Sequence, residues 1–105
     1  MAPALDATQY GFEALPEAPP LGDSFALIRE DEGVTRIGPG NGWARITCAV
    51  HSSLDAVGLT ARISAALAAR GISANIVAGL HHDHIFVPWG RRDEAMAALL
   101  ELSGR

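Results

Sequence analysis

The spacing of the apolar residues changes in the middle of the chain, and this change restricts the possible folds more than any other feature. In residues 43–50, Ile46, Cys48 and Val50 alternate with other positions, which is the period of a half-buried strand. Over residues 56–70 the apolar side chains recur at helical spacing instead. A strand followed directly by a helix predicts that both kinds of element share one domain.

The predicted helix carries its own start and stop signals. Asp55 is a good N-cap, because its carboxylate can accept a hydrogen bond from the first turn. Gly71 can adopt the left-handed conformation that ends many helices. We therefore expect a helix over residues 56–70.

The remaining elements follow from similar patterns. Residues 24–30 and 34–38 are strand-like, and Gly33 between them can take a positive φ, so residues 24–38 predict a hairpin. Two further strands are expected over residues 72–80 and 84–89, with His81–Asp83 in their connection. The second helix is expected over residues 91–104, with an apolar stripe formed by Ala95, Met96, Leu99 and Leu102.

Length and composition fit one globular domain. The chain has 105 residues, 49% of them apolar, and a net charge of −4, which argues against a nucleic-acid surface. Cys48 is the single cysteine, so no intrachain disulfide can form. No segment approaches the ~20 apolar residues that cross a bilayer, and the N-terminus lacks the pattern of a signal peptide. We expect a cytoplasmic protein that contacts neither nucleic acid nor membrane.

The expected element order is β-β-β-α-β-β-α. The proline-rich residues 1–22 are expected to form an extended leader, and residues 23–105 the single domain. Within that domain, the β-α-β-β-α core over residues 43–103 lacks only the closing strand of a ferredoxin-like β-α-β-β-α-β unit. The N-terminal hairpin is expected to take that strand's place, giving an α+β fold with an antiparallel sheet and two helices on one face.

Several motifs resemble those of the ACT domain family. Asp55-Ala56-Val57-Gly58-Leu59 is similar to the Asp-x-x-Gly-Leu sequence that opens the first helix of that family, although Val57 replaces its common proline. Gly71-Ile72-Ser73 resembles the turn into its next strand, and His82–Val87 resembles the strand after that. The likeness spans residues 24–102 and is strongest to uncharacterised bacterial ACT-like proteins with "HSSL-x-AVGLTA" and "HDH-x-FVP" sequences.

The resemblance implies a non-catalytic regulatory or sensor domain that acts as a homodimer. In that family, small ligands, often amino acids, bind between protomers near the loop from the first strand to the first helix. Gly58 would leave the helix N-terminus open to a carboxylate, and Ser52, Ser53 and Asp55 would offer hydroxyls and an anion to an amine. The expected ligand-binding residues are His51, Ser52, Ser53, Asp55, Val57, Gly58, Leu59, Asp83 and His84.

Three interpretations of the cluster His81–His84 remain open. It can be a polar, solvated turn. It can belong to the ligand site, with Asp83 and His84 contacting a molecule held at the first helix. It can also contribute to a metal site formed by His51, His82 and His84, because residues two apart in a strand point the same way and imidazoles suit zinc, nickel or copper.

The other chemically active side chains point to structural roles. Cys48 is expected to be a small core residue, and the neighbours His51, Ser52 and Ser53 lack a third group that would orient a catalytic base. Trp43 and Trp89 are expected in packing or at a dimer surface. The sequence therefore predicts neither an enzyme nor a resident cofactor.

Overall fold

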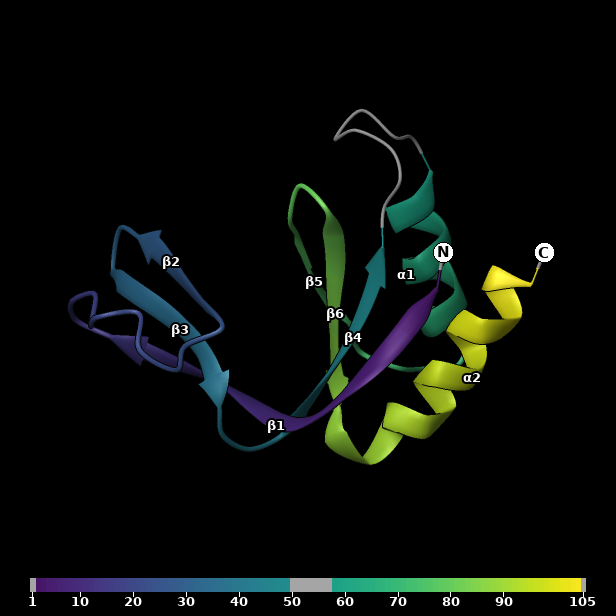
Figure 1. The fold of residues 1–105 in the computed structure, drawn as a ribbon, viewed down its shortest axis with the longest axis horizontal. Coiled ribbons are helices and arrows are strands. Elements are labelled where there is room, and N and C mark those ends of the chain that lie inside the picture. Colours follow the sequence, from purple (N-terminus) through teal and green to yellow (C-terminus); the bar gives the residue numbers. More distant parts are fainter. Residues whose placement is uncertain (1, 50–57, 105) are drawn as a thin grey trace.

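A computed structural model, which describes residues 2–49 and 58–104, shows a single sheet with two helices (Figure 1). The strands are β1 (Pro3–Leu15), β2 (Ala26–Glu30), β3 (Gly33–Pro39), β4 (Trp43–Ala49), β5 (Asn75–Ala78) and β6 (His82–Pro88). The helices are α1 (Leu59–Ala68) and α2 (Arg92–Ser103), and a 3-10 turn, η1 (Trp89–Arg91), leads into α2.

The six strands lie in the order β2-β3-β1-β4-β6-β5, and each neighbouring pair is antiparallel. This confirms the predicted antiparallel α+β architecture. Because β4 and β5 both run antiparallel to β6, they run parallel to each other with β6 between them, as a ferredoxin-like sheet requires.

The prediction that the first residues form a leader outside the domain is wrong for residues 3–15. These residues form β1, which pairs with β3 on one side and with β4 on the other. β1 therefore takes the place of the closing strand beside β4, and the hairpin of β2 and β3 lies farther out on β1. The hairpin itself is confirmed, and Gly33 at its turn has a φ of 142°.

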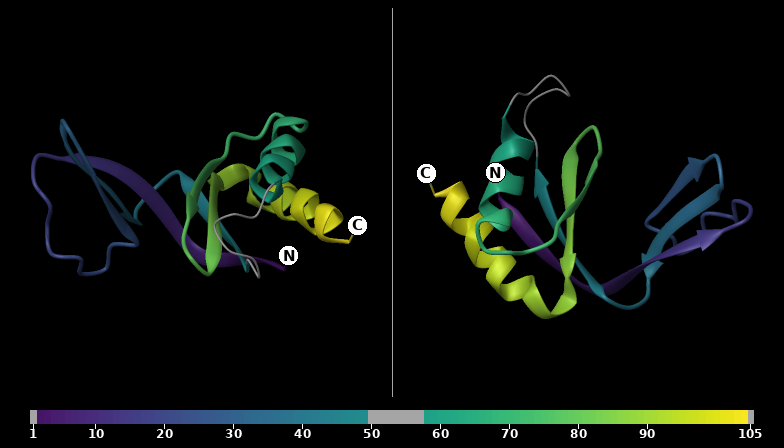
Figure 2. Two further views of the ribbon diagram at one scale, coloured as in Figure 1. Left: turned by 90° about the horizontal axis from the view of Figure 1, so that it is seen from above. Right: turned by 180° about the vertical axis from the view of Figure 1, so that it is seen from behind.

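The two helices cover one face of the sheet, which we call the helix face (Figures 1 and 2). Its core joins the inward side chains of β4 and β6 to both helices. The fully buried side chains include Ile46, Cys48, Ile63, Leu67, Ile85, Val87 and Leu99. The predicted stripe of α2 is confirmed, since Ala95 and Leu99 are buried and Met96 and Leu102 pack against them.

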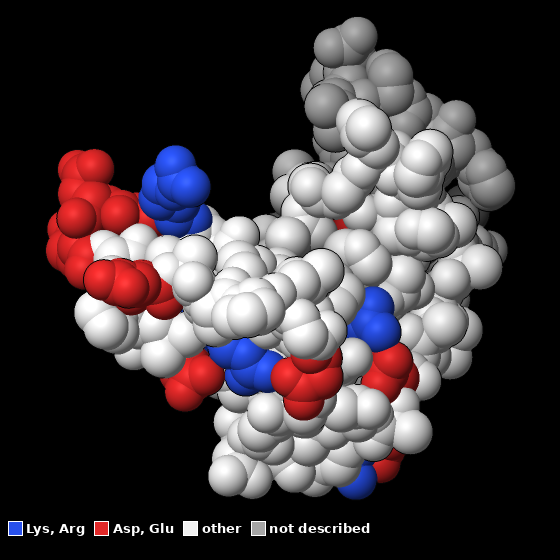
Figure 3. Space-filling model, turned by 60° about the vertical axis from the view of Figure 1, so that its left-hand side comes forward, with Lys and Arg blue, Asp and Glu red and all other residues white. Residues whose placement is uncertain are grey.

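The opposite face of the sheet, which we call the open face, carries a smaller aromatic core. Tyr10, Ile37 and Phe86 are buried there, and Phe25 and Trp43 pack against them. The sheet curls so that β2, β3 and the second half of β1 form an arm that stands apart from the helix-bearing part (Figures 1 and 2). The space-filling view shows a hollow between the two parts, and exposed acidic side chains, among them Glu30, Asp31 and Glu32, gather on the arm (Figure 3).

Several element boundaries differ from those predicted. β5 covers only residues 75–78, because Ile72 instead packs into the core beside α1. β6 begins at His82, so His82 and Asp83 belong to a strand and not to the connection. Asp55 and Val50 lie outside the described residues, and the residue at the N-cap of α1 is Gly58. The end of α1 agrees with the prediction, since Gly71 has a φ of 67°.

In the parts of the chain that the structure describes, neither helix is long and apolar enough to cross a membrane.

Candidate functional site

Strand β6 distributes the expected site residues between the two faces of the sheet. Asp83 lies opposite Cys48 and shares the helix face with Ile85 and Val87. His84 lies on the open face, within hydrogen-bonding distance of Thr47. Successive residues of a strand point to opposite faces. Asp83 and His84 are therefore neighbours in the sequence whose side chains lie on opposite sides of the sheet.

The start of α1 lies at the same end of the sheet as the turn between β5 and β6 (Figure 1). Gly58, the N-cap, has a φ of 96°, a conformation that side-chain-bearing residues rarely adopt. A glycine N-cap offers no side chain to the first N–H groups of the helix, which have no acceptors within the helix. Leu59 follows it and packs against the core.

Asp83 brings a buried carboxylate to this end of the helix face. Its exposure is only 6%, and it forms no hydrogen bond or ion pair with another described residue. Burying a charge costs free energy unless the charge is paired. Burial, followed by the negative charge of Asp83, raises the pKa of the Cys48 thiol to about 11. Cys48 is thus a protonated core residue, in line with its predicted structural role.

Five of the nine expected ligand-binding residues, His51, Ser52, Ser53, Asp55 and Val57, lie outside the described residues. Gly58, Leu59 and Asp83 lie at one end of the helix face, and His84 lies on the open face. Of the alternative metal triad, the structure describes His82 and His84, whose ring centroids are 6.0 Å apart. Within residues 2–49 and 58–104, no three His, Cys, Asp or Glu side chains gather closely enough to hold a metal ion together.

The open face holds a polar network that the sequence did not reveal, centred on Arg45. Its guanidinium donates to Asp6 Oδ2 at 2.6 Å, to the Tyr10 hydroxyl at 3.1 Å and to Thr47 Oγ1 at 3.1 Å. It also lies 4.6 Å from the ring centroid of Phe25, a cation–π distance. Arg45 thereby links β1, β4 and the segment before β2.

His84 completes this network. Its Nδ1 lies 3.2 Å from Thr47 Oγ1 and 3.3 Å from Arg45 Nη1, and its ring packs edge-on against Phe25. Burial, followed by the positive charge of Arg45, lowers the pKa of His84. The pKa of Asp6 is lowered too, first by the backbone N–H of Thr8 and also by Arg45. The only sequence signal for this network is the position of Arg45 and Thr47 on alternate residues of a predicted strand.

The lowered pKa of His84 gives a pH dependence with a definite sign. Because unfolded His84 takes up a proton more readily than folded His84, the free energy of unfolding should decrease as the pH falls below the unfolded pKa of about 6.5. The decrease should end below the folded-state pKa. Urea unfolding between pH 7.5 and 5 should show a smaller decrease in His84→Gln than in the parent, whereas His81→Gln should follow the parent. Equal pH dependence in all three would contradict this interpretation.

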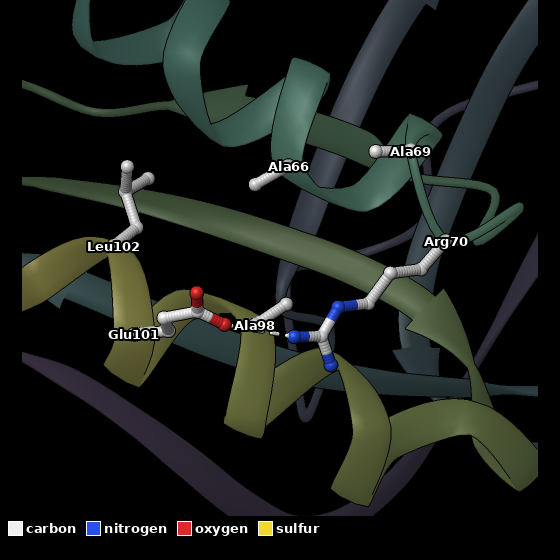
Figure 4. A pocket seen from close by; sticks show the side chains of 6 residues that line it. All are labelled: Ala66, Ala69, Arg70, Ala98, Glu101 and Leu102. Atoms are coloured by element: carbon white, nitrogen blue, oxygen red, sulfur yellow. Dashed lines mark hydrogen bonds and ion pairs between the residues drawn. The ribbon is translucent and has the colours of Figure 1, made fainter.

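A groove between the two helices is one of the cavities that lie outside these clusters. It has a volume of about 230 Å³ and is lined by small side chains and one ion pair, from Arg70 to Glu101 at 3.0 Å (Figure 4). Its residues are Ala66, Ala69, Arg70, Ala98, Glu101 and Leu102. The small alanine side chains where α1 and α2 cross leave space unfilled between the helices, which accounts for the groove without a ligand.

Comparisons with known proteins agree with this architecture. The ACT domain family matches residues 40–101, which contain β4, α1, β5, β6 and most of α2. A solved structure from Vibrio cholerae, of the protein VC0802, is similar with a TM-score of 0.81 and 39% sequence identity. The match covers 92% of this chain and 85% of that one, and VC0802 is described as a protein of unknown function and a possible transport protein. No curated protein matches the chain significantly. The family match covers more than half of the chain, and the chain therefore belongs to the ACT domain family.

Proposed function

We propose that this protein is a non-catalytic regulatory domain that binds a small molecule with an ammonium and a carboxylate group, such as an amino acid. ACT domains are typically regulatory modules that bind small molecules. The proposed site lies where α1 begins, and Gly58, Leu59 and Asp83 are its described members. His51, Ser52, Ser53, Asp55 and Val57 belong to the same proposal, and His84, on the other face, is left out of it.

The single observation that carries this proposal is the buried carboxylate of Asp83 at the sheet end where α1 starts. An ammonium group would pair with the carboxylate of Asp83, which is only 6% exposed, and would offset part of the cost of burying its charge. The positive end of α1, beside a residue without a side chain, would favour the ligand's carboxylate. The two charges of an amino acid therefore match the two features of the site.

We propose a homodimer formed through the edge of β5. Its four residues, Asn75–Ala78, carry no charge, and neither end residue is buried. The other edge of the sheet, β2, contains Arg29 and Glu30 and is followed by Asp31 and Glu32. Charged edge strands resist pairing with other strands, so β5 is the better surface. Sedimentation velocity of the purified protein measures whether the dimer forms.

A thermal-shift screen of the twenty amino acids tests the ligand. A ligand at 100 times its dissociation constant should add about 2.7 kcal/mol to the free energy of unfolding. Gly58→Val should abolish this shift, because valine at a φ of 96° alters the backbone beside the ligand. Gly42→Val is the matched control: Gly42 has a φ of 103° but lies in the loop before β4, so its variant should lose stability and keep binding.

Asp83→Asn separates the role of the charge from that of the shape. The variant should keep the fold and lose affinity for the amino acid, because a neutral amide attracts an ammonium group less strongly. If the amino acid that binds the parent bound Gly58→Val or Asp83→Asn equally tightly, the site could not lie at this end of the sheet.

A further inference from the structure

The negative charge of the chain is concentrated in the arm. Residues 10–39, which contain the second half of β1 and all of β2 and β3, hold six of the twelve acidic residues and two of the eight arginines. The charges of the remaining residues balance, so this segment accounts for the whole net charge of −4. Glu30, Asp31 and Glu32, at the turn from β2 to β3, are all exposed, and acidic side chains gather on this part of the surface (Figure 3). Such a surface attracts a basic partner.

β2 is the outer strand of the arm, and its outer edge pairs with no other described strand. On the inner side, every residue of β2 is matched to β3, from Ala26 opposite Ile37 to Glu30 opposite Gly33. The N–H and C=O groups along an unpaired edge can bind one more strand. The last three residues of β2, Ile28–Glu30, are exposed, so the described part of the chain leaves this end of the edge accessible.

The open face at this edge changes from apolar to acidic within two residues. Ala26 lies opposite the buried Ile37, so Ile28, two residues further along, points to the same face. Ile28 is 40% exposed, and Glu30 follows it on that face. A strand placed beside β2 would therefore meet an apolar side chain and then a carboxylate, with the rest of the acidic turn just beyond.

We propose that the outer edge of β2 binds an extended basic segment of another protein, which adds to the six-stranded sheet as a further strand. An apolar side chain of that segment would pack on Ile28, and a lysine or arginine two residues away would pair with Glu30. Backbone hydrogen bonds would supply affinity, and the alternating side chains would supply selectivity. This interaction is independent of the proposed function, because it uses no residue of the site at α1.

A second copy of this chain does not fit the edge. Neither edge strand of a second copy offers a basic side chain for Glu30, because β5 (Asn75–Ala78) has no charged residue and β2 carries Arg29 on the face opposite to Glu30. The negative charges of two arms would also repel each other. The charge that opposes pairing between copies would attract a basic strand, so the same residues would select the partner.

A designed peptide tests this interaction in the full-length protein. The fluorescently labelled peptide Thr-Lys-Thr-Lys-Thr-Val-Thr-Val-Thr carries its lysines and valines on one face of a strand and would lie antiparallel to β2 with the lysines at the acidic turn. Fluorescence anisotropy should show saturable binding that weakens as salt is added. A peptide of the same composition, with its lysines and valines divided between both faces, should bind about tenfold more weakly. Equal binding of the two peptides would show charge attraction only and would overturn the proposal, as would binding of neither.

Variants of the protein separate the apolar contact from the charge. Ile28→Asn should weaken peptide binding by about tenfold, because it removes apolar surface that the peptide would bury. Leu100→Asn is its control, since Leu100 is 54% exposed on α2, and should bind as the parent does. Glu32→Lys should weaken binding by about fivefold and reduce its salt dependence, whereas Asp93→Lys makes the same change of net charge at an exposed position of α2 and should have little effect. Circular dichroism checks that all four variants are folded, and parent-like binding by Ile28→Asn and Glu32→Lys would overturn the proposal.

Amide hydrogen exchange followed by NMR locates the bound peptide directly. Saturating peptide should slow the exchange of amides in β2 and leave those of β5 unchanged. Protection of β5 in place of β2 would mean that the peptide adds to the other edge, which would contradict the proposal. The thermal shift caused by an amino acid should persist in Ile28→Asn, so this proposal and the proposed function can fail separately.

Discussion

Removal of residues 1–15 is expected to abolish the cooperative unfolding transition of the protein. β1 lies between β3 and β4, so its loss would break two strand pairings at once and separate β2 and β3 from the rest of the sheet. It would also remove Tyr10 from the aromatic core and Leu5 from the helix-face core. Urea unfolding followed by circular dichroism should show no sigmoidal transition.

Removal of only the first two residues is the control for this truncation. β1 begins at Pro3, so this shorter variant should unfold with the midpoint of the parent. A truncated chain starting at Pro16 that still unfolds cooperatively would mean that β1 is dispensable, as expected for a peripheral leader.

Phe86→Ala should lower the free energy of unfolding by about 3–5 kcal/mol, the usual cost of removing a buried phenylalanine ring. Phe86 is fully buried, and its ring packs edge-on against Tyr10 at 5.6 Å and Phe25 at 5.5 Å. It therefore connects β6 to β1, through Tyr10, and to the segment before β2, through Phe25. A loss of this size is a large part of the 5–15 kcal/mol typical of a domain. Chemical denaturation measures it directly.

Phe12→Ala provides the matched control, because Phe12 is 37% exposed, lies on the same face and also contacts Phe86, at 5.4 Å. Phe12→Ala should lower the free energy of unfolding by less than half as much as Phe86→Ala does. Equal losses in the two variants would contradict the idea that burial of Phe86, more than aromatic contact as such, stabilises this face.

The sequence patterns predict the second half of the fold well and fail at β1 for a physical reason. Tyr10, Phe12 and Ala14 do alternate, which is a strand signal. The register of β1 against β4 shifts between Leu5 and Gln9, so no single period runs through the whole strand. The prolines that follow, starting with Pro16, belong to the next loop and made the whole segment resemble an extended leader.

The candidate sites were predictable only where local spacing decides the arrangement. Alternation in a strand was enough to place His82 and His84 on one face. The same rule separates Asp83 from His84, but only once β6 is known to start at His82. The partners of Arg45 could not be predicted, because Asp6, Tyr10 and Phe25 come from segments 20 to 39 residues away whose position depends on the whole sheet order.

The alternation of β6 also affects how relatives of this protein can diverge. A substitution at residue 83, 85 or 87 changes the surface under the helices, and one at residue 82, 84 or 86 changes the opposite surface. Each surface can therefore acquire or lose its own chemistry by single replacements that leave the other intact. A short strand in the middle of the domain thus allows its two surfaces to change independently.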